Sequence, residues 1–419
     1  MKTVILMMMA MLAVACGGGI SHTKVVDAKV LASVGGLEKL GTLTSIRSTD
    51  AAIYVAGESG AAAVDAQGKL LWTLELPYAT ERLIEADARG VAFTSFDLAN
   101  VDRAEGLKSF IMGNAGDIPE YSNQTVAYAS PAGKLLWSTR CEAAKAALSA
   151  PALSPDQVAV SRGATLTVFS RADGRQAWDS ELATDGSGGS GLVLQASYNR
   201  PVFANGFWYA AHLNYLAKYD VGGKVLNTSR TFGLFTPFMN ITGGLLASGE
   251  GVVFGNAPWN GKRALLLASD KDGEKNWKEE VDDKHSGVSS LAINKSGTIF
   301  AATNFVVTAF SPSGSKQWQA GNGEGGLYPG SQRGVRYIGN SFAKNFAVRK
   351  SPAEQMVADE RFVYITSRHD KSDVLTVLDA KSGTYFDSVT IGAEINDMAI
   401  TPGSLALATG DGLKLIALQ

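Results

Sequence analysis

The pentapeptide GKLLW stands at residues 68–72 and again at residues 133–137, two positions that are neither tandem nor of low complexity. Seven segments share its pattern of a polar turn, a glycine and an extended stretch. They are VDAQGKLLW (64–72), SPAGKLLW (130–137), RADGRQAW (171–178), DVGGKVLN (220–227), DKDGEKNW (270–277), SPSGSKQW (311–318) and DAKSGTYFD (379–387). A tryptophan follows the glycine by four residues in five of them, and Asn227 and Asp387 hold that place in the others. This common register indicates a structural repeat.

Each repeat predicts a β-hairpin. An Asp-Gly or Ser-Gly pair supplies the positive φ angle that a tight turn needs. The residues before the turn are apolar and β-prone, as in ALLLASD (264–270), and those after it, as in RQAWDSEL (175–182), read as a second strand. Two further strand candidates lie upstream of a turn, for example SLAIN (290–294) and GTIFAATN (297–304). Four strands per unit is therefore the expected count.

The spacing of the repeats predicts the architecture. The turn glycines from Gly133 to Gly314 follow one another at intervals of 41, 49, 50 and 41 residues. These intervals match the period of about 40–50 residues of a β-propeller blade. The intervals from Gly68 to Gly133 and from Gly314 to Gly383 are longer, and we assign the excess to insertions at 107–123 and 325–343.

The two ends of the chain predict how the ring closes. The C-terminal SLALATGDGLKLIALQ (404–419) contains two strands with no hairpin partner to follow, and DAKVLASVGG (27–36) resembles the missing last strand. The sequence thus predicts an all-β fold over residues 28–419. It is an eight-bladed β-propeller of four-stranded antiparallel blades, closed by an N-terminal strand that joins the last blade. Seven blades are the alternative.

The repeated pentapeptide then has a structural explanation. One blade cannot bury its own faces, and each tryptophan is expected to act as a wedge between neighbouring blades. The residues expected to carry this structural repeat are Gly68, Trp72, Gly133, Trp137, Gly174, Trp178, Gly273, Trp277, Gly314 and Trp318.

The N-terminus has the features of an export signal. Residues 1–15 contain one lysine and an apolar run too short to span a bilayer. The sequence Ala13-Val14-Ala15-Cys16 resembles the bacterial lipobox, although alanine stands at 13 where that pattern usually has leucine. We expect lipidation of Cys16, followed by a flexible tether over 16–27. An ordinary signal peptide with a chance cysteine is the alternative.

The turn motifs resemble the PQQ-like β-propeller repeat, in which tryptophan packs against small residues of a neighbouring blade. Ala63, Ala268 and Ala309 stand five residues before their glycines and match those small positions. Together with the lipobox and the chain length, the repeats are similar to the BamB family of outer-membrane protein assembly factors. That resemblance implies a lipid-anchored scaffold of the outer membrane that faces the periplasm. It would be a monomer within a complex with the barrel-assembly machinery or other envelope proteins.

The repeat's namesakes are quinone-dependent dehydrogenases, and this resemblance raises an enzymatic alternative. Such enzymes use a vicinal cysteine pair and a calcium ion held by Glu, Asn and Asp, whereas Cys141 has no neighbouring cysteine. The histidines show no metal-binding spacing; they are His22, His212, His285 and His369. The net charge of −2 gives no reason to expect a nucleic-acid partner. We expect no catalytic residue, metal or cofactor.

Aromatic and basic residues outside the repeat register suggest a recognition surface in loops. The candidates are Trp208, Tyr209, Trp259, Tyr328, Arg333 and Arg336. The alternative for the aromatic residues is that they belong to strands and face neighbouring blades. Binding of a glycan or small ligand in the central channel is the alternative to a protein scaffold.

Overall fold

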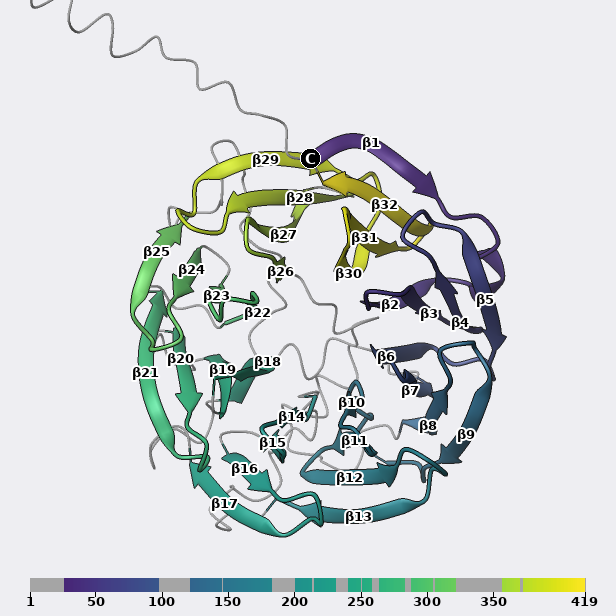
Figure 1. The fold of residues 1–419 in the computed structure, drawn as a ribbon, viewed down its shortest axis with the longest axis vertical. Helices are drawn as coiled ribbons and strands as arrows, with labels where there is room; N and C mark the ends of the chain where they lie inside the picture. Colours follow the sequence, from purple (N-terminus) through teal and green to yellow (C-terminus); the bar gives the residue numbers. More distant parts are fainter. Residues whose placement is uncertain are drawn as a thin grey trace, which may run out of the picture.

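The computed structural model describes residues 26–97, 121–144, 146–182, 200–212, 215–230, 240–249, 251–257, 264–282, 288–303, 306–321, 356–369 and 372–418. In these ranges the chain forms eight four-stranded antiparallel sheets arranged in a ring (Figure 1). A 3-10 turn at Glu38–Leu40 is the one helical segment among them. The prediction of an eight-bladed propeller is confirmed, and the seven-bladed alternative is wrong.

The first seven blades each use four consecutive strands, with the first strand nearest the axis (Figure 1). Blade 1 is β2 (Leu43–Ser48), β3 (Ile53–Gly57), β4 (Gly60–Val64) and β5 (Leu70–Glu75). Blade 2 is β6 (Glu81–Asp87), β7 (Gly90–Asp97), β8 (Ser122–Ala129) and β9 (Leu135–Arg140). Blade 3 is β10 (Ala152–Leu153), β11 (Gln157–Arg162), β12 (Thr165–Ser170) and β13 (Gln176–Glu181). Blade 4 is β14 (Val202–Ala204), β15 (Phe207–His212), β16 (Tyr215–Tyr219) and β17 (Val225–Arg230).

The numbering continues around the ring in the same way. Blade 5 is β18 (Asn240–Ser248), β19 (Gly251–Ala257), β20 (Ala264–Ser269) and β21 (Lys275–Asp282). Blade 6 is β22 (Ser290–Ile293), β23 (Ile299–Ala302), β24 (Val307–Phe310) and β25 (Lys316–Ala320). Blade 7 is β26 (Met356–Ala358), β27 (Phe362–His369), β28 (Ser372–Asp379) and β29 (Tyr385–Thr390).

Blade 8 joins the two ends of the chain. It contains β30 (Ile395–Thr401), β31 (Ser404–Thr409) and β32 (Gly412–Leu418), and its outermost strand is β1 (Val26–Ser33). β1 runs antiparallel to β32, with Val26 opposite Leu418 (Figure 1). The N-terminal strand therefore closes the ring as predicted, beginning at Val26 rather than at residue 28.

The two long intervals between turn glycines are insertions rather than hidden blades. Gly68 and Gly133 lie in the last turns of blades 1 and 2, and Gly314 and Gly383 lie in those of blades 6 and 7. Most of the loop expected at 107–123, and all of that at 325–343, falls outside the described residues. Residues 121–123 are the exception, because Tyr121 pairs with Ala144 in an isolated bridge and β8 begins at Ser122.

The apolar core is divided among the interfaces between blades. Eight clusters of buried residues each combine side chains from two neighbouring blades. Between blades 1 and 2, for example, Tyr54 and Ala63 pack with Phe93 and Ala127. The middle strands face a neighbouring blade on both sides, so strands such as β3 and β31 are buried along their whole length.

The two faces of the ring differ in their connections. On one, which we call the turn face, the first strand of a blade joins the second, and the third joins the fourth, through two to five residues. The connections on the opposite, loop face join the second strand to the third and one blade to the next. The three longest, 98–121, 182–201 and 321–355, join strand ends on the loop face. β1 begins and β32 ends at the turn face, where the Leu418 amide donates to the Gly403 carbonyl.

Candidate functional site

The tryptophan register forms a belt of contacts near the rim on the turn face. Each indole N–H of the five repeats donates to a carbonyl oxygen in the hairpin turn of the next blade, at 2.8–3.1 Å. The pairs are Trp72 with Pro131, Trp137 with Arg171, Trp178 with Val221, Trp277 with Pro312 and Trp318 with Ala380. These side chains therefore join blades 1 to 2, 2 to 3, 3 to 4, 5 to 6 and 6 to 7.

The turn glycine has two physical reasons to be glycine. Gly174, for example, has a φ of +71°, which favours glycine over other residues. A Cβ at this position would also lie only 2.5 Å from the ring of Trp137 in the preceding blade. Asn227, which replaces tryptophan in blade 4, keeps the polar part of the contact, because its side-chain N–H donates to the Asp272 carbonyl at 3.1 Å.

A second interblade contact joins blades 2 and 3 on the turn face. The guanidinium of Arg171 donates to both carboxylate oxygens of Asp87 and to the Tyr128 hydroxyl, the last at 2.6 Å. Its carbon lies 4.9 Å from the centroid of the Tyr128 ring, within cation–π range. Burial by itself raises the pKa of Asp87, but hydrogen bonds from Arg171 and from the Arg89 backbone outweigh burial, and the pKa is lowered.

This lowered pKa predicts a pH-dependent contribution to stability. A carboxyl whose pKa is lower in the folded state stabilises the fold above its unfolded pKa of about 3.8 and loses that effect as the pH falls through the folded value. We therefore expect the stability difference between wild type and Asp87→Asn to be largest at neutral pH and to shrink below about pH 4. Urea titrations of both proteins over this range measure the difference. A difference that does not change with pH would contradict the assignment.

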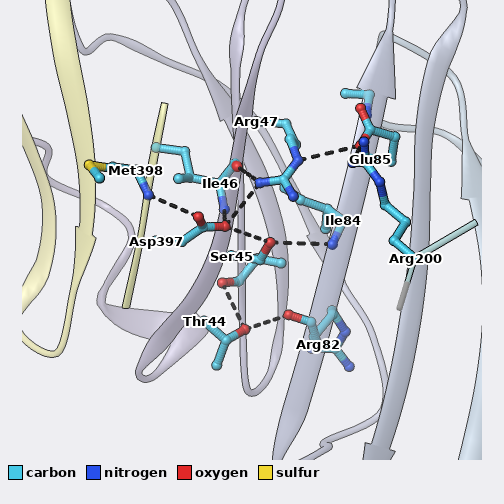
Figure 2. Close-up of polar contacts among 12 residues, drawn as sticks. Thr44, Ser45, Ile46, Arg47, Arg82, Ile84, Glu85, Arg200, Asp397 and Met398 are labelled. Carbon is cyan, nitrogen blue, oxygen red and sulfur yellow. Dashed lines mark hydrogen bonds and ion pairs between the residues drawn. The ribbon is translucent and has the colours of Figure 1, made fainter. Parts of the chain in front are cut away.

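The charged side chains of the innermost strands form a chain of ion pairs near the axis (Figure 2). Asp397 of β30 contacts Arg47 of β2 at 3.1 Å, and Arg47 contacts Glu85 of β6 at 3.4 Å. Glu85 is also paired with Arg200, which immediately precedes blade 4. The chain of alternating charge therefore connects blades 8, 1, 2 and 4. It includes no residue of blade 3, whose inner strand β10 has only two residues.

Asp397 is the most deeply buried member of this axial network, with 4% of its side chain exposed. One carboxylate oxygen accepts hydrogen bonds from the Ser45 hydroxyl at 3.1 Å and the Ile46 amide at 3.0 Å, in addition to its contact with Arg47. The other oxygen accepts from the Met398 amide at 2.9 Å (Figure 2). Asp397 therefore fastens the last blade to the first at the seam of the ring.

The axial network is suited to holding blades together rather than to chemistry. Its two arginines and two carboxylates balance in charge and are paired with one another, so neither carboxylate resembles a free general base. Across the described ranges there is no group of three His, Cys, Asp or Glu side chains that could hold a metal ion. His212 lies in β15, where burial lowers its pKa to about 4 and keeps its ring neutral. Cys141 is partly buried, and burial raises the pKa of its thiol.

The structure corrects part of the recognition surface expected from the sequence. Trp208 and Tyr209 lie in β15, not in a loop, and both are fully buried between blades. Trp208 packs against blade 3 and Tyr209 against blade 5, because neighbouring residues of a strand point to opposite faces of the sheet. The remaining candidates, Trp259, Tyr328, Arg333 and Arg336, lie outside the described residues, as does Cys16.

The axial residues were not predicted from the sequence. Arg47, Glu85, Arg200 and Asp397 stand as isolated charges in four separate segments, without a shared motif or spacing. Only the alternation of polar with apolar residues in an innermost strand could have marked them, and β2 and β6 are too short to show it clearly.

Comparison with known proteins places the chain in a family. A family model described as "Outer membrane protein assembly factor BamB" matches residues 41–279, more than half of the chain. The chain belongs to the BamB family. A search of curated proteins found no match. The matched region extends from just before β2 into β21, so it covers blades 1 to 5.

Solved structures similar to this chain share its fold at low sequence identity. BamB from Moraxella catarrhalis has a TM-score of 0.57 and 12% identity, covering 89% of this chain and 93% of that protein. The computationally designed Ika8 protein has a TM-score of 0.61 and 13% identity, covering 93% and 99%. The quinohemoprotein alcohol dehydrogenase from Comamonas testosteroni has a TM-score of 0.56 and 10% identity, covering 95% and 78%. At such identities these likenesses show the fold alone.

The dehydrogenase likeness raises the question of whether a quinone and its calcium ion fit this BamB-family chain. The carboxylates at the axis are engaged by arginine, serine and backbone N–H groups. The chain also has no vicinal cysteine pair, because Cys16 and Cys141 are its only cysteines. The residues that the structure describes therefore do not fit this cofactor.

Proposed function

We propose that this chain is a non-catalytic scaffold of the bacterial envelope, held to the outer membrane by a lipid on Cys16 and serving the barrel-assembly machinery. The observation that carries the proposal is the BamB family match over residues 41–279. The axial network supports a scaffold, because its charged groups are paired with one another across four blades. For the same reason it does not favour a glycan or small ligand in the channel.

The asymmetry of the ring supports the loop face as the surface that meets a partner. Long connections on a rigid scaffold commonly carry binding residues, and the three longest join strand ends on this face. The short connection between β5 and β6 adds Tyr78, which is 63% exposed although its ring is largely apolar. Exposed aromatic side chains are enriched at protein interfaces.

Site-specific photocrosslinking in the native envelope tests this proposal. A photoreactive residue at Tyr78, on the loop face, is expected to capture subunits of the barrel-assembly machinery. The matched control carries the same probe at Gln67, an exposed residue in a hairpin turn on the turn face, and is expected to capture none. Capture of no assembly subunit from either position would contradict the assembly role while leaving the propeller intact.

A further inference from the structure

Two neighbouring blades expose leucines that the fold does not bury. Leu71 in β5 is 50% exposed, and Leu135 and Leu136 in β9 are 38% and 48% exposed. We call these three residues the apolar rim. The tryptophans that follow them point inward, where Trp72 and Trp137 contact the next blade. The repeat therefore needs the glycine and the tryptophan of GKLLW, but it does not need exposed leucines.

Three of the other blades show that polar residues serve at the same positions. The two residues before the tryptophan are exposed in blades 3, 5 and 6 as well, and five of these six are polar. They are Gln176 and Ala177, Lys275 and Asn276, and Lys316 and Gln317. Blade 4 differs, because Val225 and Leu226 occupy these positions and are each 43% exposed. The repeat therefore does not require exposed leucines, and the feature that separates blades 1 and 2 from blade 4 is their place near β1 (Figure 1).

The apolar rim lies beside the place where the N-terminal segment joins the propeller. β1, the outermost strand of blade 8, neighbours β5 along the rim, and β9 follows on its other side (Figure 1). β1 begins at Val26 on the turn face, and Leu71 and Leu136 each lie at the start of a strand that leaves this same face. The Trp72 ring covers Gly133, so the two blades are in contact at this level.

The charges next to the apolar rim suit a lipid surface. Lys69 lies two residues before Leu71, and Lys134 lies immediately before Leu135. Both lysines are exposed, and neither forms an ion pair within the described ranges. Basic side chains beside exposed leucines are the combination that binds the interface of membranes with anionic lipids. Residues 17–25 would span at most about 35 Å between an acylated Cys16 and Val26. This short tether would keep the membrane surface close to the apolar rim, at a higher local concentration than any partner that diffuses freely.

We propose that the apolar rim docks on the surface of the bilayer that holds the acylated Cys16, with Leu71, Leu135 and Leu136 in the interface. This inference rests on the lipid anchor of the proposed function. Docking holds blades 1, 2 and 8 toward the membrane. It turns the edge of the turn face, rather than the loop face, to the lipid, and the loop face stays accessible to protein partners.

Spin-label accessibility measures this docking directly. The acylated full chain carrying Cys141→Ser is labelled at Leu71→Cys or at Leu136→Cys and reconstituted in vesicles of phosphatidylethanolamine and phosphatidylglycerol. The matched control is Leu226→Cys in blade 4, which has the same position in its repeat and 43% exposure but lies across the ring from blade 8 (Figure 1). We expect labels at 71 and 136 to be about threefold less accessible to a water-soluble nickel chelate than the label at 226.

Flotation of the same vesicles separates the two proposals. A chain that fails to float with vesicles overturns the lipid anchor and, with it, the docking. A chain that floats while all three labels are equally accessible to the nickel chelate overturns the docking alone. Spectral broadening at Leu71→Cys that disappears on dilution with unlabelled protein would identify a second copy of the chain on the apolar rim, and it would also overturn membrane docking.

Discussion

Replacement of Asp397 by alanine is expected to lower the free energy of unfolding by about 3–5 kcal/mol. Asp397 is nearly fully buried at the seam between blades 8 and 1. Its loss removes one of the two carboxylate partners of Arg47 and the acceptor of three buried donors, which are the Ser45 hydroxyl and the Ile46 and Met398 amides. Removing one member of a buried ion pair is costly because the remaining charge stays desolvated. Urea unfolding followed by tryptophan fluorescence measures the change.

A surface ion pair provides the control for this replacement. Asp156 lies 3.9 Å from Arg89, but its side chain is 93% exposed, so Asp156→Ala is expected to leave the unfolding midpoint nearly unchanged. Equal effects at Asp397 and Asp156 would show that the seam depends on the pairing of β1 with β32 and not on the axial carboxylate.

Replacement of Trp137 by alanine is expected to cost a similar amount, about 3–5 kcal/mol. The Trp137 ring is 8% exposed and lies between Tyr128 of its own blade and Phe169 of the next, with ring centroids 6.0 and 6.2 Å apart. The Arg171 carbonyl also loses the hydrogen bond that the indole N–H donates to it. The alanine variant thus combines a cavity with an unpaired carbonyl at the interface of blades 2 and 3, and thermal and urea unfolding both report the loss.

Trp72 lies in the other copy of GKLLW and provides a control for the Trp137 replacement. It makes the same contact with the next turn, but it is more exposed, and its aromatic neighbour is Tyr54 of its own blade at 6.1 Å. We expect Trp72→Ala to destabilise the protein less than Trp137→Ala does. The reverse order would contradict the assignment of the larger effect at Trp137 to its burial between aromatic rings.

The propeller could be predicted from the sequence because the residues that define each repeat lie close together in the chain. Each turn glycine and its tryptophan lie four residues apart, and the turn chemistry places the following strand at the rim. Asn227 shows that the tryptophan is not required in every blade. Its amide replaces only the hydrogen bond of the indole, and yet blade 4 keeps its place in the ring. The long intervals were readable as insertions because LKSFIMGNAGDIPEYSN (107–123) and similar stretches lack a turn followed by tryptophan.

The wrong prediction for Trp208 and Tyr209 and the missed axial network also have physical causes. Phe207, Trp208 and Tyr209 form a continuous aromatic run. A strand with one face in solvent alternates apolar and polar residues, and this run does not, so the sequence alone favours a binding loop. In a propeller the middle strands are covered on both sides, so such a run belongs inside. The axial network depends on contacts such as that of Arg47 with Asp397, which lie 350 positions apart and come together only when the circle is complete.

The head-to-tail sheet of blade 8 has a consequence for how the protein is made. β1 is synthesised before all the other strands, but its hydrogen-bonding partner β32 is synthesised after them. The circle therefore cannot be completed until β32 has been made, and β1 stays unpaired until then. A product shortened at its C-terminus would lose a strand at one end and orphan another at the opposite end, exposing a free sheet edge of the kind that promotes aggregation.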